Sequence, residues 1–214
     1  MLVEIWSDVV CPWCYIGKRR FEKAVDAFGR DDVEVEWRSF QLDPAHPKGA
    51  RKPLLQHLAD KYGCTIDEAR AMNDRVTALA AAEGLAYDLD SYTVVNTFDA
   101  HRMAHLARAH GLGTEMHERL LRAQLVEGQV LDDVDTLVRL GGEVGLPADE
   151  TRAMLAGPDY GSEVDDDIRT ARALGITGVP FFAIDRTYGI AGAQPADLIR
   201  QTLETARDRS IPAG

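Results

Sequence analysis

Residues 2–28 have the sequence LVEIWSDVVCPWCYIGKRRFEKAVDAF. The opening segment Leu2–Ser7 predicts a short buried strand. The apolar residues Phe21, Val25 and Phe28 recur at helical spacing and predict a helix after the cysteines. A Cys-Pro-Trp-Cys motif therefore lies where a strand passes into a helix. At such a junction the first sulfur is close to the free N–H groups and positive end of the helix, which favour a thiolate over a thiol.

The spacing of Cys11 and Cys14 predicts thiol–disulfide exchange. The second sulfur lies one helical turn beyond the first, close enough to form a small disulfide ring. We expect Cys11 to be the nucleophile, because it is nearer the end of the helix and is predicted to be the more exposed of the two. Pro12 and Trp13 between them favour a helix start over a metal-binding turn.

Zinc binding is the competing interpretation of the cysteine pair. Zinc requires two further ligands, and the chain has one other cysteine, Cys64. His101 and His105 lie four residues apart and would share one helical face, so they are candidates to complete a site. Together with Asp99, however, they more often form a partly exposed helix face, which is the interpretation we favour. Cys64 is predicted to be a buried packing residue.

The composition of the chain excludes several classes of function and predicts a cellular compartment. The 214 residues are 45% hydrophobic and 28% charged, and the net charge of −11 argues against a nucleic-acid or anionic-membrane surface. No segment approaches the ~18 apolar residues of a membrane span. Glu4 and Asp8 interrupt the N-terminal apolar stretch and no basic segment precedes it, so no signal peptide is predicted. We therefore expect a reducing, cytoplasmic location, where three cysteines serve chemistry rather than a disulfide framework.

The rest of the chain predicts a thioredoxin arrangement with an insertion. The segment Val33–Phe40 alternates apolar and charged residues, as an edge strand does, and would pair in parallel with the first strand. From Lys52 to Gly175 there is almost no strand signal. Five or six helices are expected there instead, one of them opened by a capping box at residues 65–68. An acidic helix over 162–174, a hairpin of strands at 181–184 and 188–190, and a helix from Pro195 complete the order.

This order predicts an α/β fold, a thioredoxin fold with a large inserted all-α domain. Residues 1–50 and 162–214 would form the discontinuous thioredoxin-like domain, and residues 51–161 the inserted helical domain. The acidic residues near the start of the 162–174 helix are interpreted as a solvated helix N-terminus: Glu163, Asp165, Asp166 and Asp167.

Two motifs in combination resemble a known family. These are SDVVCPWCYIG over residues 7–17 and GITGVPFF over residues 175–182, with support from FQLDP at 40–44, Asn96-Thr97 and the segment 100–102. Together they resemble the DsbA-like thioredoxin-fold oxidoreductases, and most closely their FrnE-like branch. The resemblance covers essentially the whole chain. The FrnE name carries an association with polyketide biosynthesis, which no residue here demonstrates.

The resemblance implies roles for individual residues. In such proteins the first cysteine attacks a substrate disulfide and the second resolves the mixed disulfide, which assigns these roles to Cys11 and Cys14. It also implies that Pro180 is a cis proline lying against the pair, although an ordinary trans turn is the alternative from sequence alone. A cis bond there would expose the Val179 backbone to an extended substrate. The substrate-binding residues implied are Pro12, Trp13, Gly178, Val179 and Pro180.

Two features depart from the secreted DsbA oxidants. Those proteins have Pro-His between the cysteines, and Trp13 supplies no imidazole, so a strongly depressed thiol pKa is not expected. Glu4 precedes Cys11 by seven residues, one more than the buried acid of those proteins. It either faces the site as a proton acceptor or is a solvated strand residue, and we favour the solvated interpretation.

The function implied is that of a protein disulfide oxidoreductase, acting as reductase, isomerase or oxidase on disulfide- or thiol-containing protein clients. No cofactor is expected beyond the redox-active pair, with a small thiol such as glutathione as a candidate reductant and no metal. Kappa-class glutathione transferases and 2-hydroxychromene-2-carboxylate isomerases have the same fold, which makes thiol-dependent chemistry on a small aromatic molecule the alternative. They typically carry a serine where this chain has Cys11, and retention of both cysteines argues against that function.

Overall fold

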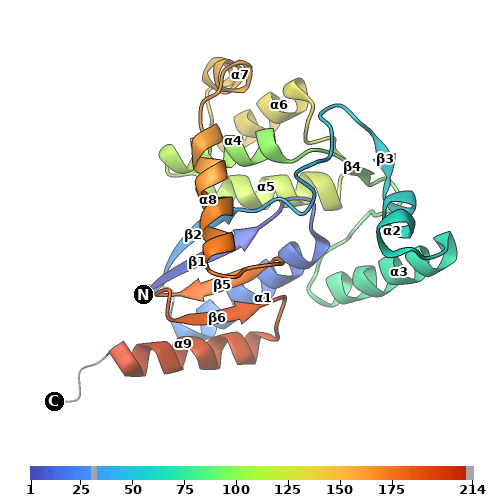
Figure 1. The fold of residues 1–214 in the computed structure, drawn as a ribbon. Helices are drawn as coiled ribbons and strands as arrows, with labels where there is room; N and C mark the ends of the chain where they lie inside the picture. The colour runs from blue at the N-terminus through green and yellow to red at the C-terminus, as the bar shows by residue number, and fades with distance from the viewer. Residues whose placement is uncertain (30–32, 211–214) are drawn as a thin grey trace.

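The computed structural model describes residues 1–29 and 33–210. Residues 30–32 and 211–214 of the predicted thioredoxin-like domain lie outside this description. The protein has an α/β fold in which a mixed sheet carries helices on both faces and a helical block extends beyond one end of it (Figure 1). Within the described ranges, no helix is both long enough and apolar enough to span a membrane.

The main sheet has the strand order β2-β1-β5-β6. Strand β1 (Leu2–Ser7) pairs in parallel with β2 (Glu34–Ser39) and antiparallel with β5 (Phe181–Ile184), which in turn pairs antiparallel with β6 (Tyr188–Ala191). The parallel βαβ unit, the edge position of β2 and the hairpin are confirmed. Because β1 is an inner strand, its carboxyl end lies between neighbouring strands on both sides. The cysteines follow directly after this end.

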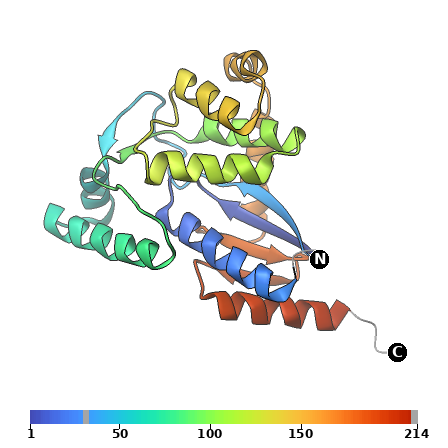
Figure 2. The same ribbon diagram turned by 180° about the vertical axis from the view of Figure 1, so that it is seen from behind.

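Alternation along β1 divides the core between two layers of helices. Val3 and Ile5 face α1 (Pro12–Phe28) and α9 (Ala196–Ser210), which lie side by side on one face (Figure 2). Trp6 points to the opposite face and packs against Ala171 of α8 (Gly161–Ala173). Both layers are apolar and closely packed. The strand β1, which precedes the cysteines, is therefore held in place on both faces.

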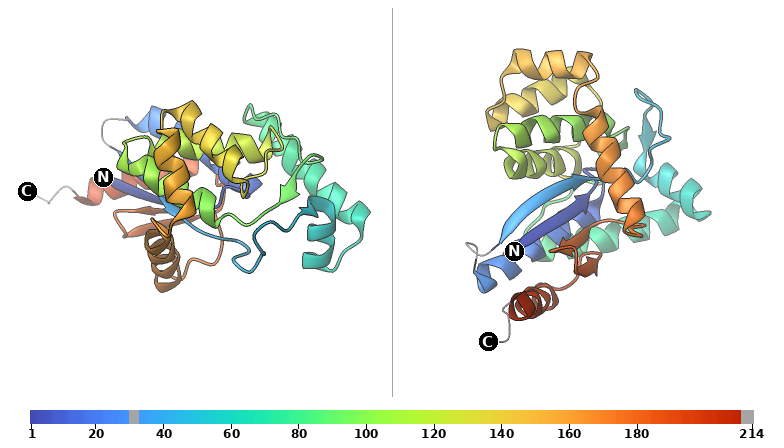
Figure 3. Two further views of the ribbon diagram at one scale, coloured as in Figure 1. Left: turned by 90° about the horizontal axis from the view of Figure 1, so that it is seen from above. Right: turned by 60° about the vertical axis from the view of Figure 1, so that its left-hand side comes forward.

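The inserted segment is almost entirely helical. Its helices are α2 (Leu54–Tyr62), α3 (Ile66–Ala82), α4 (Phe98–Ala109), α5 (Gly113–Leu125), α6 (Val134–Val144) and α7 (Ala148–Ala156). The predicted capping box is present at the start of α3. A ladder of β3 (Lys52–Pro53) with β4 (Thr93–Val94) was not predicted, because two residues are too few to show a strand pattern. Helices α4 to α7 stack beyond the end of the sheet, and α2 and α3 project to the side (Figure 3).

The prediction that Glu4 is solvated is wrong. Its side chain is 1% exposed and forms ion pairs with Arg38 of β2 at 2.8 Å and with Arg186 of the β5–β6 turn at 2.5 Å. These two guanidinium groups, Arg186 first, outweigh the effect of burial and lower the pKa of Glu4 below its ordinary value. A buried carboxylate requires such partners. Glu4 therefore joins β1 to β2 and to the β5–β6 turn.

Two further burial predictions are wrong. Asp167 is not part of a solvated helix start: it is 4% exposed, accepts the Ser39 N–H at 2.8 Å and lies 3.2 Å from Arg38. It thereby attaches α8 to the end of β2, whereas Asp165 and Asp166 are exposed as expected and Glu163 is half-buried. Cys64 is half-buried at the junction of α2 and α3 rather than a core residue.

One acidic residue of α5 contacts three polar side chains of α1. Glu118 of α5 accepts a hydrogen bond from the Tyr15 hydroxyl at 2.5 Å and pairs with Lys18 at 2.6 Å and with Arg19, all on α1. Although burial acts in the opposite direction, these partners lower the pKa of Glu118 to about 2. A charged carboxylate thus helps to hold α1 against α5.

Replacing Glu118 should reveal a pH-dependent contribution to stability. A carboxylate whose folded pKa is depressed stabilises the fold above its unfolded pKa near 4.5, and that stabilisation is lost as pH falls toward 2. We expect Glu118→Gln to lower the free energy of unfolding by about 1–2 kcal/mol at pH 7, because solvent partly screens the pairs, and by clearly less at pH 3. Urea unfolding at both pH values measures this.

The control is Glu204→Gln, which removes a surface pair with Arg200 within α9. It should cost only about 0.5 kcal/mol at pH 7. An equal loss for Glu118→Gln at pH 3 and pH 7 would contradict an ionic role for Glu118.

Candidate active site

Cys11 is the N-cap residue of α1. Its backbone is extended (φ −88°, ψ 115°), Pro12 occupies the first helical position, and the sulfur makes no capping hydrogen bond. The Cys11 N–H donates to the Asp8 carbonyl at 3.0 Å, which closes the turn between β1 and α1. The first turn of α1 leaves free N–H groups beside this residue. The sequence-based placement of the first cysteine at a helix start is thus what the structure shows.

Cys14 lies one turn further along the helix. Its N–H donates to the Cys11 carbonyl at 3.0 Å, and both cysteines are free thiols. Cys14 is 1% exposed and Cys11 4% exposed, so the expected difference in exposure is small. Burial, reinforced by the neighbouring Cys11, raises the pKa of the Cys14 thiol well above its ordinary value. Cys14 therefore carries a proton at neutral pH.

The segment before β5 closes the site from one side. The Val179–Pro180 peptide bond is cis, and the Cys11 sulfur lies 3.7 Å from the Val179 carbonyl oxygen. The Pro180 ring packs against α1 at Gly17, where an added Cβ would lie 2.7 Å from the Pro180 Cγ. This close contact requires a glycine, and it holds the Val179 carbonyl next to the cysteine.

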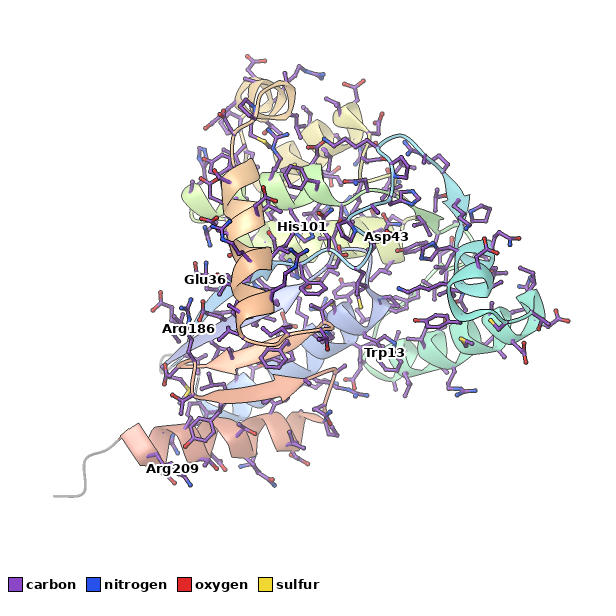
Figure 4. All side chains as sticks on the ribbon, in the orientation of Figure 1. Trp13, Glu36, Asp43, His101, Arg186 and Arg209 are labelled. Carbon is purple, nitrogen blue, oxygen red and sulfur yellow. The ribbon has the colours of Figure 1, made fainter. Side chains whose placement is uncertain are left out.

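A pocket of about 340 Å³ opens on the other side of Cys11, toward α2 and α3. We call it the front pocket. Cys11, Pro12 and Trp13 line it, whereas Cys14 and residues 178–180 do not. Its rim carries large apolar side chains that are partly exposed: Trp13 42%, Leu42 37%, Tyr62 60% and Met72 39%. Figure 4 shows Trp13 on the side of the molecule where α3 lies.

Two tyrosines support the turn that presents Cys11. The Tyr87 hydroxyl donates to the Pro12 carbonyl at 2.6 Å, and the Tyr92 hydroxyl donates to the Val10 carbonyl at 2.7 Å. Both come from the segment between α3 and α4, so the inserted domain fixes the active-site backbone directly. Burial raises the pKa of both hydroxyls, which keeps them protonated as donors. No local pattern in the sequence pointed to these residues.

A buried acid–histidine pair lies beside the cysteine turn. Asp8 Oδ1 is 3.2 Å from His101 Nε2, with both side chains 2% exposed, and Asp8 Oδ2 accepts the Leu42 N–H at 2.8 Å. The expectation of a partly exposed helix face is therefore wrong for His101. It is also wrong for His105, which is 5% exposed and bonds Asp167 and Ser39.

The two histidines are thus engaged with different carboxylates. Across the described part of the chain, no group of three or more His, Cys, Asp or Glu side chains is arranged to hold a metal ion. The zinc interpretation, in which His101 and His105 would complete a site with the cysteine pair, therefore has no geometric support among these residues.

Residues 2–204 match the family model of the DSBA-like thioredoxin domain. The chain belongs to this family. It is 46% identical to a probable DsbA oxidoreductase from Streptomyces coelicolor, with a TM-score of 0.96 over 100% of this chain and 93% of the other. That likeness extends to the inserted domain as well as the thioredoxin part.

More distant structures share the fold. The cytosolic disulfide reductase DsbM from Pseudomonas aeruginosa is 22% identical, with a TM-score of 0.67 over 99% of this chain and all of that one. A 2-hydroxychromene-2-carboxylate isomerase is 15% identical, with a TM-score of 0.68 over 98% of this chain and 96% of the other. At these identities the likeness concerns the fold, which hosts both oxidoreductases and an isomerase.

The two thiols should differ sharply in reactivity. Cys11 lines the front pocket, while Cys14 is enclosed and has a raised pKa. In a Cys64→Ser background, iodoacetamide at pH 7 should modify Cys11 at least about tenfold faster than Cys14. Peptide mass spectrometry over a time course measures both rates. In urea, where the protein is unfolded, the alkylation rates of Cys11 and Cys14 should become equal. Equal rates in the folded protein would count against the assignment of Cys11 as nucleophile.

The contact between Gly17 and Pro180 can be tested with a matched pair of glycines. Gly17→Ala forces the rigid proline ring away, and we expect it to destabilise the protein by about 1–3 kcal/mol despite the better helix propensity of alanine. Gly142→Ala in α6 meets no atom within 4 Å and should stabilise by about 0.5–1 kcal/mol. Urea unfolding of both variants gives the comparison. A neutral or stabilising Gly17→Ala would show that the contact is not tight.

Proposed function

We propose that this protein is a thiol–disulfide oxidoreductase that acts on protein or peptide disulfides through Cys11 and Cys14. The observation that carries the proposal is the unequal placement of the two sulfurs. Cys11 is at the helix end and opens on the front pocket, while Cys14 is enclosed behind it. Membership of an oxidoreductase family supports the same chemistry.

The geometry supports a two-step exchange. The Cys11 thiolate attacks one sulfur of the client disulfide, the client S–S bond breaks, and the other client sulfur leaves as a thiolate that takes up a proton. The Cys14 thiol then loses its proton and attacks the Cys11 sulfur, which releases the second client sulfur. The client gains two electrons and two protons, and Cys11 and Cys14 become a disulfide.

The shape of the site favours an extended client over a small molecule. The front pocket adjoins a second hollow of about 420 Å³, and the two share Leu42, Asp43, His57 and Lys61. Together they form a groove that leads away from Cys11. The exposed apolar rim suits unfolded or flexible segments, and the Val179 backbone beside Cys11 is placed to contact such a segment.

We infer that the protein works as a reductase or isomerase in a reducing, cytoplasmic setting. An ordinary dithiol is kept reduced by a glutathione-poised pool. A small thiol such as glutathione is the reductant we propose. DsbM, a cytosolic disulfide reductase, has been crystallised with glutathione. A reduction potential as oxidising as about −120 mV would overturn the reductase direction.

The test is client turnover by the wild type and by two variants. Cys14→Ser should trap mixed disulfides with a scrambled, disulfide-containing protein, because the second step is lost, and Cys11→Ser should trap none. Both variants should lose at least about 100-fold in reactivation of the scrambled protein, measured as recovered client activity.

Glutathione conjugation or isomerisation of a small aromatic substrate is measured in parallel as the alternative function. If the wild type never turns over a protein disulfide, and activity on the small molecule survives Cys14→Ser, the transferase or isomerase function replaces the one proposed.

A further inference from the structure

A second cavity lies behind the active site, at the open edge of β2. It has a volume of about 290 Å³, and we call it the rear cavity. Among the residues that line it are Trp37, Ser39, His101, Ala104, His105 and His117. In Figure 4, Glu36 of this edge and Trp13 of the front pocket lie on opposite sides of the molecule.

The rear cavity contains polar groups without protein partners. Trp37 Nε1, His105 Nδ1 and His117 Nε2 are buried and make no hydrogen bond. Buried polar atoms are almost always satisfied, and a polar cavity of this size has room for several ordered water molecules. The cavity is therefore suited to hold water next to these rings.

His101 connects the two cavities. His101 is one of the residues that line the rear cavity, its Nε2 is 3.2 Å from Asp8 Oδ1, and Asp8 lines the front pocket together with Cys11. The Cys14 sulfur lies against the Asp8 backbone amide, in the turn between β1 and α1. Asp8 and His101 thus form one continuous polar contact from the cysteine turn to the rear cavity.

The two other histidines that line the rear cavity with His101 have surroundings of their own. His105, one turn along α4, is engaged with Asp167. His117 of α5 is neutral, since burial and the Lys18 charge lower its pKa well below the ordinary value. Neither competes for the Asp8 carboxylate.

A bound client would block the direct route by which the Cys14 proton reaches solvent. In the second step of the exchange Cys14 must lose its proton while the client is still bound to Cys11. The apolar rim of the front pocket, with Trp13 at its edge, would then be covered and its water excluded. The proton needs a way out that does not pass through the client.

We propose that Asp8 and His101 form a rear proton relay, in which the proton released by Cys14 passes to Asp8, then to His101, and leaves through water in the rear cavity. The relay rests on the proposed disulfide exchange and extends it. It changes no electron count: the proton lost by Cys14 reaches solvent, and the departing client thiolate is protonated independently.

The first test removes His101. In a Cys64→Ser background, reduced protein is mixed with an oxidised protein client, quenched with acid and analysed for mixed disulfide by mass spectrometry. His101→Ala should slow resolution of the mixed disulfide about tenfold or more. Added imidazole, which can enter the enlarged rear cavity, should restore the rate. With the small neutral hydroxyethyl disulfide, which leaves the front pocket open to water, the change should stay within about twofold.

The second test fills the cavity and leaves the relay residues intact. Ala104 lines the rear cavity on the same helix as His101. Ala104→Phe should slow resolution of the protein client and spare the small disulfide, and Ala104→Ser should behave as the wild type. If thermal melting shows that Ala104→Phe is not folded, Ala104→Leu takes its place.

The outcomes separate the relay from the proposed function. A wild type that turns over no disulfide would refute the function itself. A wild type that turns over both substrates, with variants that match it, would refute only the relay. Equal slowing of both substrates, or a defect that imidazole does not relieve, would show that His101 is structural.

Discussion

The buried carboxylate of Asp8 is the interaction on which the active site depends. Its backbone carbonyl accepts the Cys11 N–H, and its side chain accepts the Leu42 N–H and contacts His101. These partners belong to the β1–α1 turn, the segment after β2 and the inserted helix α4. A charge taken out of water must be satisfied in this way. Asp8 therefore joins the thioredoxin core to the helical insertion at the position of the cysteines.

The two buried acids of β1 and its following turn have separate tasks. Glu4, in the middle of the strand, is held by Arg38 and Arg186, and it holds β2 and the β5–β6 turn against β1. Asp8 faces a histidine and lines the front pocket. The acid that borders the front pocket is thus Asp8, next to the motif, and not the strand residue Glu4.

The sequence predicted the features that local patterns determine. The strands of the main sheet, the parallel βαβ unit, the hairpin and the position of Cys11 followed from periodicity, capping residues and the order of elements. Burial of Glu4, His101 and Asp167 did not, because each is buried by a partner distant in the sequence: Arg186, Asp8 and Ser39. Tyr87 and Tyr92 were missed for the same reason, since their hydroxyls bond backbone carbonyls, which no sequence pattern reveals.

The surroundings of Cys11 bear on the direction of the chemistry. A strong oxidant needs a reduced form stabilised as a thiolate, which requires donors or cations around the sulfur. Here the Tyr87 and Tyr92 hydroxyls are already donated to Pro12 and Val10, and the group facing the sulfur is the Val179 carbonyl, an acceptor that suits a thiol. Trp13 adds no imidazole. None of these three contacts brings a hydrogen-bond donor to the Cys11 sulfur. These contacts are consistent with the reductase direction proposed above.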